Sequence, residues 1–133
     1  FSGVVVDKGA DVGDEVQVGD RVTGEPSVYI CGCCDYCLSE HYNLCPERKV
    51  MGYWHNGCFA PYCNATFVHT LPEAVDFEAG ALTELLACCV HSVIEQAGVT
   101  AGDFVAITGP GPVGLFAALV ALAAVGGPLH YWC

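Results

Sequence analysis

The chain has 133 residues, of which 53% are apolar, and its 15 acidic side chains outnumber four basic ones. The apolar content is enough for a hydrophobic core and argues against disorder. Nucleic acids and anionic membrane surfaces both require a clustered positive patch, and the sequence contains none, so the composition argues against both partners.

The ten cysteines fit either a secreted disulfide scaffold or an intracellular protein with free or metal-bound thiols. Residues 1–25 carry scattered charges and no apolar signal core. We therefore expect a cytoplasmic protein whose thiols stay reduced or bind metal.

The first 80 residues have the pattern of short strands and turns. Val4–Val6 is predicted to be a buried strand, and Gly19-Asp20 is predicted to turn the chain before a further strand at Val22. Residues 31–46 have no sustained period and are predicted to form a loop. Residues 53–68 have a β-like composition again.

The pattern changes after residue 72. Residues 81–97 carry apolar side chains at helical spacing, and Gly98 comes next, where a C-terminal cap is expected. The apolar run 104–108 is typical of a parallel strand. A helix is predicted from about Pro112 to Val125. Its apolar run is shorter than the roughly 20 residues that cross a bilayer, so the helix is expected to be buried in the protein. No second strand is predicted after it.

Four cysteines form the pattern C-x2-C-x2-C-x7-C: Cys31, Cys34, Cys37 and Cys45. Thiolates at this spacing can share one ion, and the tetrahedron that they form is the geometry that Zn²⁺ accepts. A site with four protein ligands is closed, so the predicted zinc is structural. Four thiolates leave a net negative charge, and the basic pair Arg48 and Lys49, just beyond Cys45, is a candidate to balance it.

Two other interpretations of these cysteines stay open. They can be ordinary buried thiols, or they can hold an iron–sulfur cluster, because the pattern ending in Cys45-Pro46 is similar to the bacterial ferredoxin run. That run has x3 before its last cysteine, whereas this chain has x7. The other cysteines have no ligand spacing, and Cys88 and Cys89 are expected to be small buried hydrophobes. The five histidines are dispersed and are expected to be surface or hydrogen-bonded residues.

The segment Gly109-Pro110-Gly111-Pro112-Val113-Gly114 matches G-x-G-x-x-G. Alone it can be a plain turn, but here it joins a predicted strand to a predicted helix. In that context the first glycine makes the tight turn, the second lets a pyrophosphate approach the backbone, and the third permits close helix–strand packing. The helix N-terminus offers N–H groups to phosphates. The dinucleotide-binding residues predicted here are Gly109, Gly111, Val113 and Gly114, although residues 126–133 contain no acidic residue for the ribose.

The cysteine spacing, the segment Val18-Gly19-Asp20-Arg21-Val22 and the glycine turn together resemble the medium-chain zinc dehydrogenases, in particular the sorbitol (polyol) and threonine dehydrogenase branch. Phe1-Ser2-Gly3-Val4-Val5 resembles the segment immediately after the family's Gly-His-Glu motif. Leu82-Thr83-Glu84 resembles its Thr-Glu-Pro, although Leu85 replaces the proline. The resemblance covers residues 1 to 125, and three independent motifs occur in family order.

This resemblance implies an α/β fold with a β-barrel part. Residues 1–80 would form a partial GroES-like catalytic domain with the zinc loop, and residues 81–133 a connecting helix and the first βα unit of a Rossmann domain that binds NAD(H) or NADP(H). It also implies a homo-oligomer and an alcohol or polyol substrate whose hydroxyl is polarised by a second, catalytic zinc. Glu84 matches a glutamate at or next to that zinc, or is simply an acidic residue favoured in a helix's first turn.

The family's cysteine and His-Glu ligands are expected before Phe1, and a catalytic zinc needs about three protein ligands. Glu84 cannot hold it alone. We therefore expect a truncated piece of an NAD(P)-dependent zinc oxidoreductase for secondary alcohols or polyols, inactive by itself. The alternatives are a non-catalytic structural zinc-binding protein and an iron–sulfur electron carrier.

Overall fold

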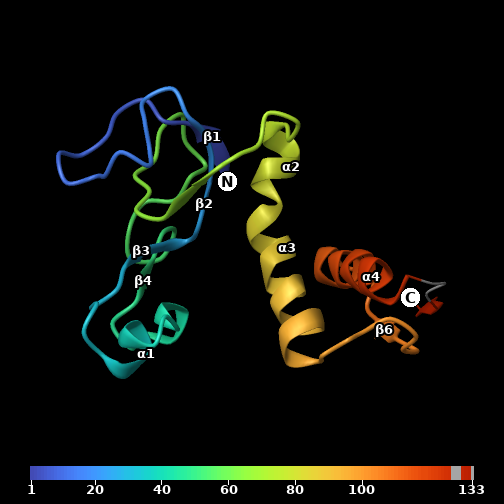
Figure 1. Ribbon diagram of the computed structural model, residues 1–133. Coiled ribbons are helices and arrows are strands. Elements are labelled where there is room, and N and C mark those ends of the chain that lie inside the picture. Colours follow the sequence, from blue (N-terminus) through green and yellow to red (C-terminus); the bar gives the residue numbers. More distant parts are fainter. Residues whose placement is uncertain (127–129, 133) are drawn as a thin grey trace. The chain divides into compact units, whose positions relative to one another are not determined.

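The computed structural model describes residues 1–126 and 130–132. The chain divides into two compact units, Phe1–Ala81 and Leu82–Cys133, each with its own elements (Figure 1). The first unit holds the short strands and the cysteine loop, and the second holds the longer helices and the glycine turn.

The first unit is built on a three-stranded antiparallel sheet in the order β1-β2-β5, formed by Ser2–Val4, Arg21–Gly24 and Val68–Thr70. Gly3 pairs with Val22 and Thr23 pairs with His69. Strand β2 is central, and its Val22 and Thr23 are buried. The sheet core is therefore small and is concentrated on β2.

Helix α2 (Phe77–Ala81) packs on β1 and β2. The buried Thr23 hydroxyl lies 2.8 Å from the carbonyl oxygen of Gly80. A Cβ atom at Gly80 would lie only 2.6 Å from the Leu71 side chain, so any larger residue there would displace Leu71.

A second, two-stranded sheet carries the cysteine loop. Strands β3 (Ser27–Tyr29) and β4 (Lys49–Val50) pair antiparallel, with Ser27 opposite Val50. The chain between them forms helix α1 (Asp35–Leu38) and the 3₁₀ turn η1 (Tyr42–Leu44). The two strands thus bring both ends of the loop together.

The second unit starts with helix α3 (Thr83–Val90), which continues into the π-helical segment η2 (His91–Gln96). Strand β6 (Ala106–Thr108) is followed by helix α4 (Pro112–Val125) and strand β7 (His130–Trp132), which pairs with β6 in parallel. Helix α4 contacts α3, η2 and β6. Its buried residues Val120, Ala121 and Val125, together with Cys89 of α3, form the core of this unit.

Several boundaries differ from the sequence-based expectations. The helix expected over 81–97 is present as α3 and η2. Leu82 separates α3 from the short helix α2, and the geometry changes from α to π at His91. The prediction that α4 is the last element is wrong, because β7 pairs with β6. Gly98, however, has φ +66°, the left-handed conformation expected of a C-terminal glycine cap.

Burial is also lower than predicted. The run Val4–Val6 is not a buried strand, since Val4 is 49% and Val6 62% exposed. Most of residues 53–68 is irregular chain, and regular pairing resumes only at β5. Cys89 is buried as expected, but Cys88 is exposed. Helix α4 is buried on one side only, because Leu115, Leu119 and other apolar residues face outwards.

Across residues 1–126 and 130–132, none of the helices has the length and the apolar content needed to cross a bilayer.

Candidate metal centre and dinucleotide-binding turn

The four cysteines of the C-x2-C-x2-C-x7-C pattern converge in the loop between β3 and β4. Cys31 lies just after β3, Cys34 is the N-cap of α1, Cys37 lies in α1, and Cys45 ends η1. The left-handed conformation of Gly32 (φ +70°) turns the chain between the first two cysteines. Cys45 is buried and the other three are half-buried. Their sulfur atoms all lie within 4.8 Å of one another.

The sulfur–sulfur distances match the edges of a tetrahedron around one zinc ion. Four sulfur atoms at about 2.3 Å from a central ion lie about 3.8 Å apart. The Cys31 sulfur lies 3.9 Å from that of Cys37 and 3.7 Å from that of Cys45. This spacing favours a single ion over a cluster of several irons bridged by sulfides. Among residues 1–126 and 130–132 these four form the only group of three or more metal-ligating side chains.

Backbone N–H groups support the sulfur atoms as negatively charged ligands. The N–H of Cys34 donates to the Cys31 sulfur at 3.4 Å, and the N–H of Cys31 donates to the Cys45 sulfur at 3.5 Å. Backbone N–H groups of Cys33 and Cys34 lower the pKa of Cys31 to about 6. Desolvation raises the pKa of Cys37 to about 12, so without a cation the site does not hold four thiolates at neutral pH. The donor set and its geometry therefore fit a divalent cation.

The basic residues next to the loop have other partners. The Arg48 side chain donates to the Ser27 hydroxyl at 2.8 Å, and the Lys49 ammonium lies 5.3 Å from the centre of the Tyr29 ring. Both contacts hold β3 and β4 together rather than pairing with sulfur. The expected balancing of the thiolate charge is thus left mainly to backbone N–H groups.

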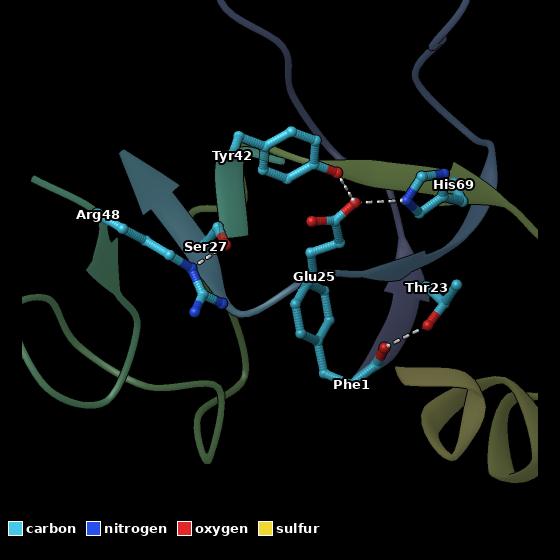
Figure 2. A network of polar contacts seen from close by, with 7 residues as sticks. All are labelled: Phe1, Thr23, Glu25, Ser27, Tyr42, Arg48 and His69. Atoms are coloured by element: carbon cyan, nitrogen blue, oxygen red, sulfur yellow. Dashed lines mark hydrogen bonds and ion pairs between the residues drawn. The ribbon is translucent and has the colours of Figure 1, made fainter. Parts of the chain in front are cut away.

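A polar network that the sequence did not reveal connects the cysteine loop to the three-stranded sheet (Figure 2). The Glu25 carboxylate accepts a hydrogen bond from the Tyr42 hydroxyl at 2.8 Å and lies 3.0 Å from Nε2 of His69. The Tyr42 ring stacks on Phe67 with 5.5 Å between ring centres. These partners are 17 and 44 residues from Glu25 in sequence, so no local pattern indicates them.

The glycine turn of the second unit joins β6 to α4. Gly109 has φ +108°, a conformation that residues with a Cβ rarely adopt. Gly111 is the N-cap of α4 with extended φ −79°, and Pro112 occupies the first helical position, where it removes no intrahelical hydrogen bond. Gly114 lies in the first turn of the helix and is half-buried.

A ligand can approach this turn closely. A Cβ atom added at Gly109 or Gly111 would meet no atom of the described chain within 4 Å. The first N–H groups of a helix have no intrahelical acceptor, and Val113 and Gly114 supply such groups at the start of α4. Open space beside free donors at a helix N-terminus suits a phosphate.

Glu84 is exposed in the first turn of α3, where its carboxylate lies 3.9 Å from the Cys88 sulfur. It belongs to no group of three ligands in the described part of the chain. The described residues therefore do not assemble a catalytic metal site around it. His69 and His91 are exposed and hydrogen-bonded to carboxylates, and neither lies in a metal-ligating group.

Comparisons with known proteins agree with this architecture. The profile of the alcohol dehydrogenase GroES-like domain matches residues 1–73, more than half of the chain. D-arabitol-phosphate dehydrogenase of Enterococcus avium is 48% identical over 118 residues, which cover 87% of this chain and 33% of that protein. Sorbitol dehydrogenase of Halalkalibacterium halodurans is 48% identical over 123 residues, 91% of this chain and 35% of that protein.

Solved structures give the same result. A protein described as a zinc-binding dehydrogenase from Sinorhizobium meliloti 1021, bound to NADP, superposes with a TM-score of 0.84 at 36% identity. The superposition covers 93% of this chain and 36% of that one.

The chain belongs to the zinc-dependent medium-chain dehydrogenase family, with an alcohol dehydrogenase GroES-like domain. Its relatives are polyol and alcohol dehydrogenases, and it spans about a third of their length. The fold class predicted from the sequence, α/β with a GroES-like part, is confirmed. The four-cysteine cluster is able to hold one structural zinc.

Proposed function

We propose that this chain carries the structural zinc loop and the phosphate-binding turn of an NAD(P)-dependent oxidoreductase that transfers a hydride from a secondary alcohol or polyol. The observation that carries the proposal is the set of four sulfur atoms within 4.8 Å of one another, inside a domain of the dehydrogenase family. The polyol dehydrogenases among its relatives support the substrate class.

The ligands proposed for the structural zinc are Cys31, Cys34, Cys37 and Cys45. A zinc ion held by four thiolates supplies a cross-link and no open coordination position. The chain preorganises the loop for the metal. Strands β3 and β4 fix the two ends of the loop, and backbone N–H groups donate to the sulfur atoms. The cross-link would make this otherwise irregular loop rigid.

The residues proposed to hold the dinucleotide are Gly109, Gly111, Val113 and Gly114. When bound, the nicotinamide supplies the hydride acceptor. The role of this chain is to leave space for the pyrophosphate above the two first glycines and to direct the N–H groups of Val113 and Gly114 at it. Both NAD(H) and NADP(H) fit this role, because the turn contacts the shared pyrophosphate.

Glu84 remains the proposed contribution of this chain to a catalytic zinc, as its match to the family motif implies. The described residues supply no further ligands beside it, so they do not fit that metal by themselves. A 133-residue polypeptide of this sequence should therefore show no turnover. NAD reduction with sorbitol, threonine and simple secondary alcohols, with zinc supplied, tests this, and turnover that is lost on Glu84→Ala would contradict it.

Metal analysis and calorimetry test the central proposal. We expect one zinc per chain and measurable binding of NAD(H) or NADP(H). Zinc without dinucleotide binding would favour a non-catalytic structural zinc protein instead. Absorption of visible light by the purified chain would favour an iron–sulfur carrier, since zinc has no such colour.

We further propose a cytoplasmic location and a homo-oligomeric state. The metal-ligating pattern of the cysteines supports the first, and the family resemblance supports the second. Cell fractionation and light scattering are the corresponding measurements.

A further inference from the structure

Three sulfur-containing side chains lie together in the irregular chain before β5, outside the metal-ligating pattern. The thiol of Cys58 lies 3.2 Å from the sulfur of Met51, and the Cys63 thiol is close enough to raise the pKa of Cys58. Cys58 and Cys63 line the same cavity of about 860 Å³ in the first unit. Two thiols therefore face one cavity without a metal-ligating role.

The two thiols differ in their access to solvent. Cys63 is exposed, whereas Cys58 is half-buried. Burial, and then the neighbouring Cys63 thiol, raise the pKa of Cys58 to about 11, so Cys58 stays protonated near neutral pH. A dissolved oxidant therefore reacts first with the exposed thiol of Cys63. The neighbouring Cys58 thiol is then available to resolve the oxidised sulfur as a disulfide.

The chain between the two thiols can adjust. Four residues separate them, and residues 57–66 form neither helix nor strand. Within the described residues, no backbone–backbone hydrogen bond involves residues 58–66. A disulfide requires Cα atoms about 4.4–6.8 Å apart, and a segment without ladder hydrogen bonds can reach that separation at small cost.

We propose that Cys63 and Cys58 form an oxidisable thiol pair that reacts with hydroperoxides. The Cys63 thiolate attacks the peroxide, the O–O bond breaks, and Cys63 becomes a sulfenic acid while the peroxide leaves as water or an alcohol after taking up a proton. The Cys58 thiol then attacks the sulfenic sulfur, an S–S bond forms, and water leaves. Two thiols lose two electrons in total, and the peroxide accepts them.

Among the other described cysteines, Cys33 is also exposed, but the thiol beside it belongs to Cys31, a ligand of the proposed zinc. Cys89 is 2% exposed and directs its thiol at the Val113 carbonyl, and its neighbour Cys88 faces Glu84. The four cysteines of the loop face one another around the proposed zinc position, and in the zinc-loaded chain their sulfur atoms would be bound to the metal and less accessible to an oxidant. Oxidation of the zinc-loaded chain should thus be selective for one pair.

The test is a peptide map of the zinc-loaded chain after treatment with one equivalent of hydrogen peroxide. We expect two fewer free thiols per chain and a single linkage, between Cys58 and Cys63, that dithiothreitol reverses. Zinc content, measured in parallel, should stay unchanged and shows that the loop is intact.

Three variants sharpen the result. Cys63→Ser should abolish the thiol loss, Cys58→Ser should leave Cys63 as a sulfenic acid that dimedone traps, and Cys88→Ser should behave as the parent chain. Recovery of Cys58 and Cys63 as free thiols while other cysteines are oxidised would overturn the proposal. Conversion of Cys63 to sulfinic acid without a bond to Cys58 in the parent chain would overturn it too, and the parent's map decides even where a variant folds poorly.

Discussion

The cysteine loop of the first unit and the glycine turn of the second are both short motifs, but they are completed in different ways. In the loop the ligands converge on one another: four sulfur atoms from Cys31 to Cys45 already have the spacing of a single-ion site. In the turn, Gly109 and Gly111 leave empty space, and the donors at the start of α4 point outwards. The geometry of the chain alone therefore indicates what the closed cysteine site binds, whereas the open glycine turn is completed only when its ligand is bound.

The largest expected effect is the loss of one ligand from the closed site. Cys34→Ser should abolish zinc binding, because a structural zinc contributes roughly 10–16 kcal/mol of apparent binding free energy and depends on all its ligands. Metal analysis of the purified variant, after competition with a chelator, measures the effect. Cys88→Ser, outside the cluster, is the matched control and should keep one zinc. Retention of zinc by Cys34→Ser would mean that the loop is not the metal site.

Removal of the metal should affect the cysteine loop but not the glycine turn and its helix. In the zinc-free chain the desolvated Cys37 thiol becomes protonated, and we expect the loop from Cys31 to Cys45 to lose its order. Hydrogen exchange should become faster at Leu38 and Ser39, whose N–H groups donate to the carbonyl oxygens of Cys34 and Asp35. Exchange within α4 should not change. Equal acceleration in α4 would show that the second unit also depends on zinc and that the two regions are not independent.

In the open site, the two glycines should respond differently to substitution. Gly111→Val should abolish dinucleotide binding, because its side chain occupies the space meant for the pyrophosphate. Its φ is ordinary and nothing lies within 4 Å, so the free energy of unfolding should change by less than about 1 kcal/mol. Gly109→Ala should instead cost roughly 1–3 kcal/mol, because φ +108° is strained for alanine.

Titration calorimetry and thermal unfolding of the two variants provide the measurements. Gly102→Ala is a control for strain alone, since Gly102 also has a positive φ but lies outside the turn. Equal dinucleotide affinity of the parent chain and Gly111→Val would contradict the assignment of this turn as the dinucleotide-binding site.

The smallest effect concerns the network that connects the loop to the sheet. Tyr42→Phe keeps the stacking on Phe67 but removes the hydrogen bond to Glu25, and should lower the unfolding free energy by about 1–2 kcal/mol. His69→Ala should cost less than about 1 kcal/mol, because His69 is 64% exposed. Urea unfolding of the zinc-loaded variants checks the order. A larger loss for His69→Ala would reverse the roles assigned to the two partners.

Patterns that depend on neighbouring residues predicted the structure well. Helix α4 (Pro112–Val125) was expected from a run that is apolar apart from glycine, and Gly98 caps the preceding helical segment. The strand expected over 104–108 is present as β6, although shorter. The predictions of burial held for Cys89 but failed for Val4, Val6 and Cys88, which are exposed, because burial is set by the element that packs on a residue.

The sequence by itself determined the C-x2-C-x2-C-x7-C pattern and the G-x-G-x-x-G turn, since both depend on spacings of a few residues along one segment. It also carried enough of the motif order to indicate the family. Only the tertiary structure decided that β7 returns beside β6, that Glu25 joins Tyr42 to His69, and that the Cys58 thiol lies beside Met51 and lines one cavity with Cys63. These contacts join parts of the chain that packing and hydrogen bonding of the whole unit bring together. The spacing of residues within one segment therefore does not indicate them.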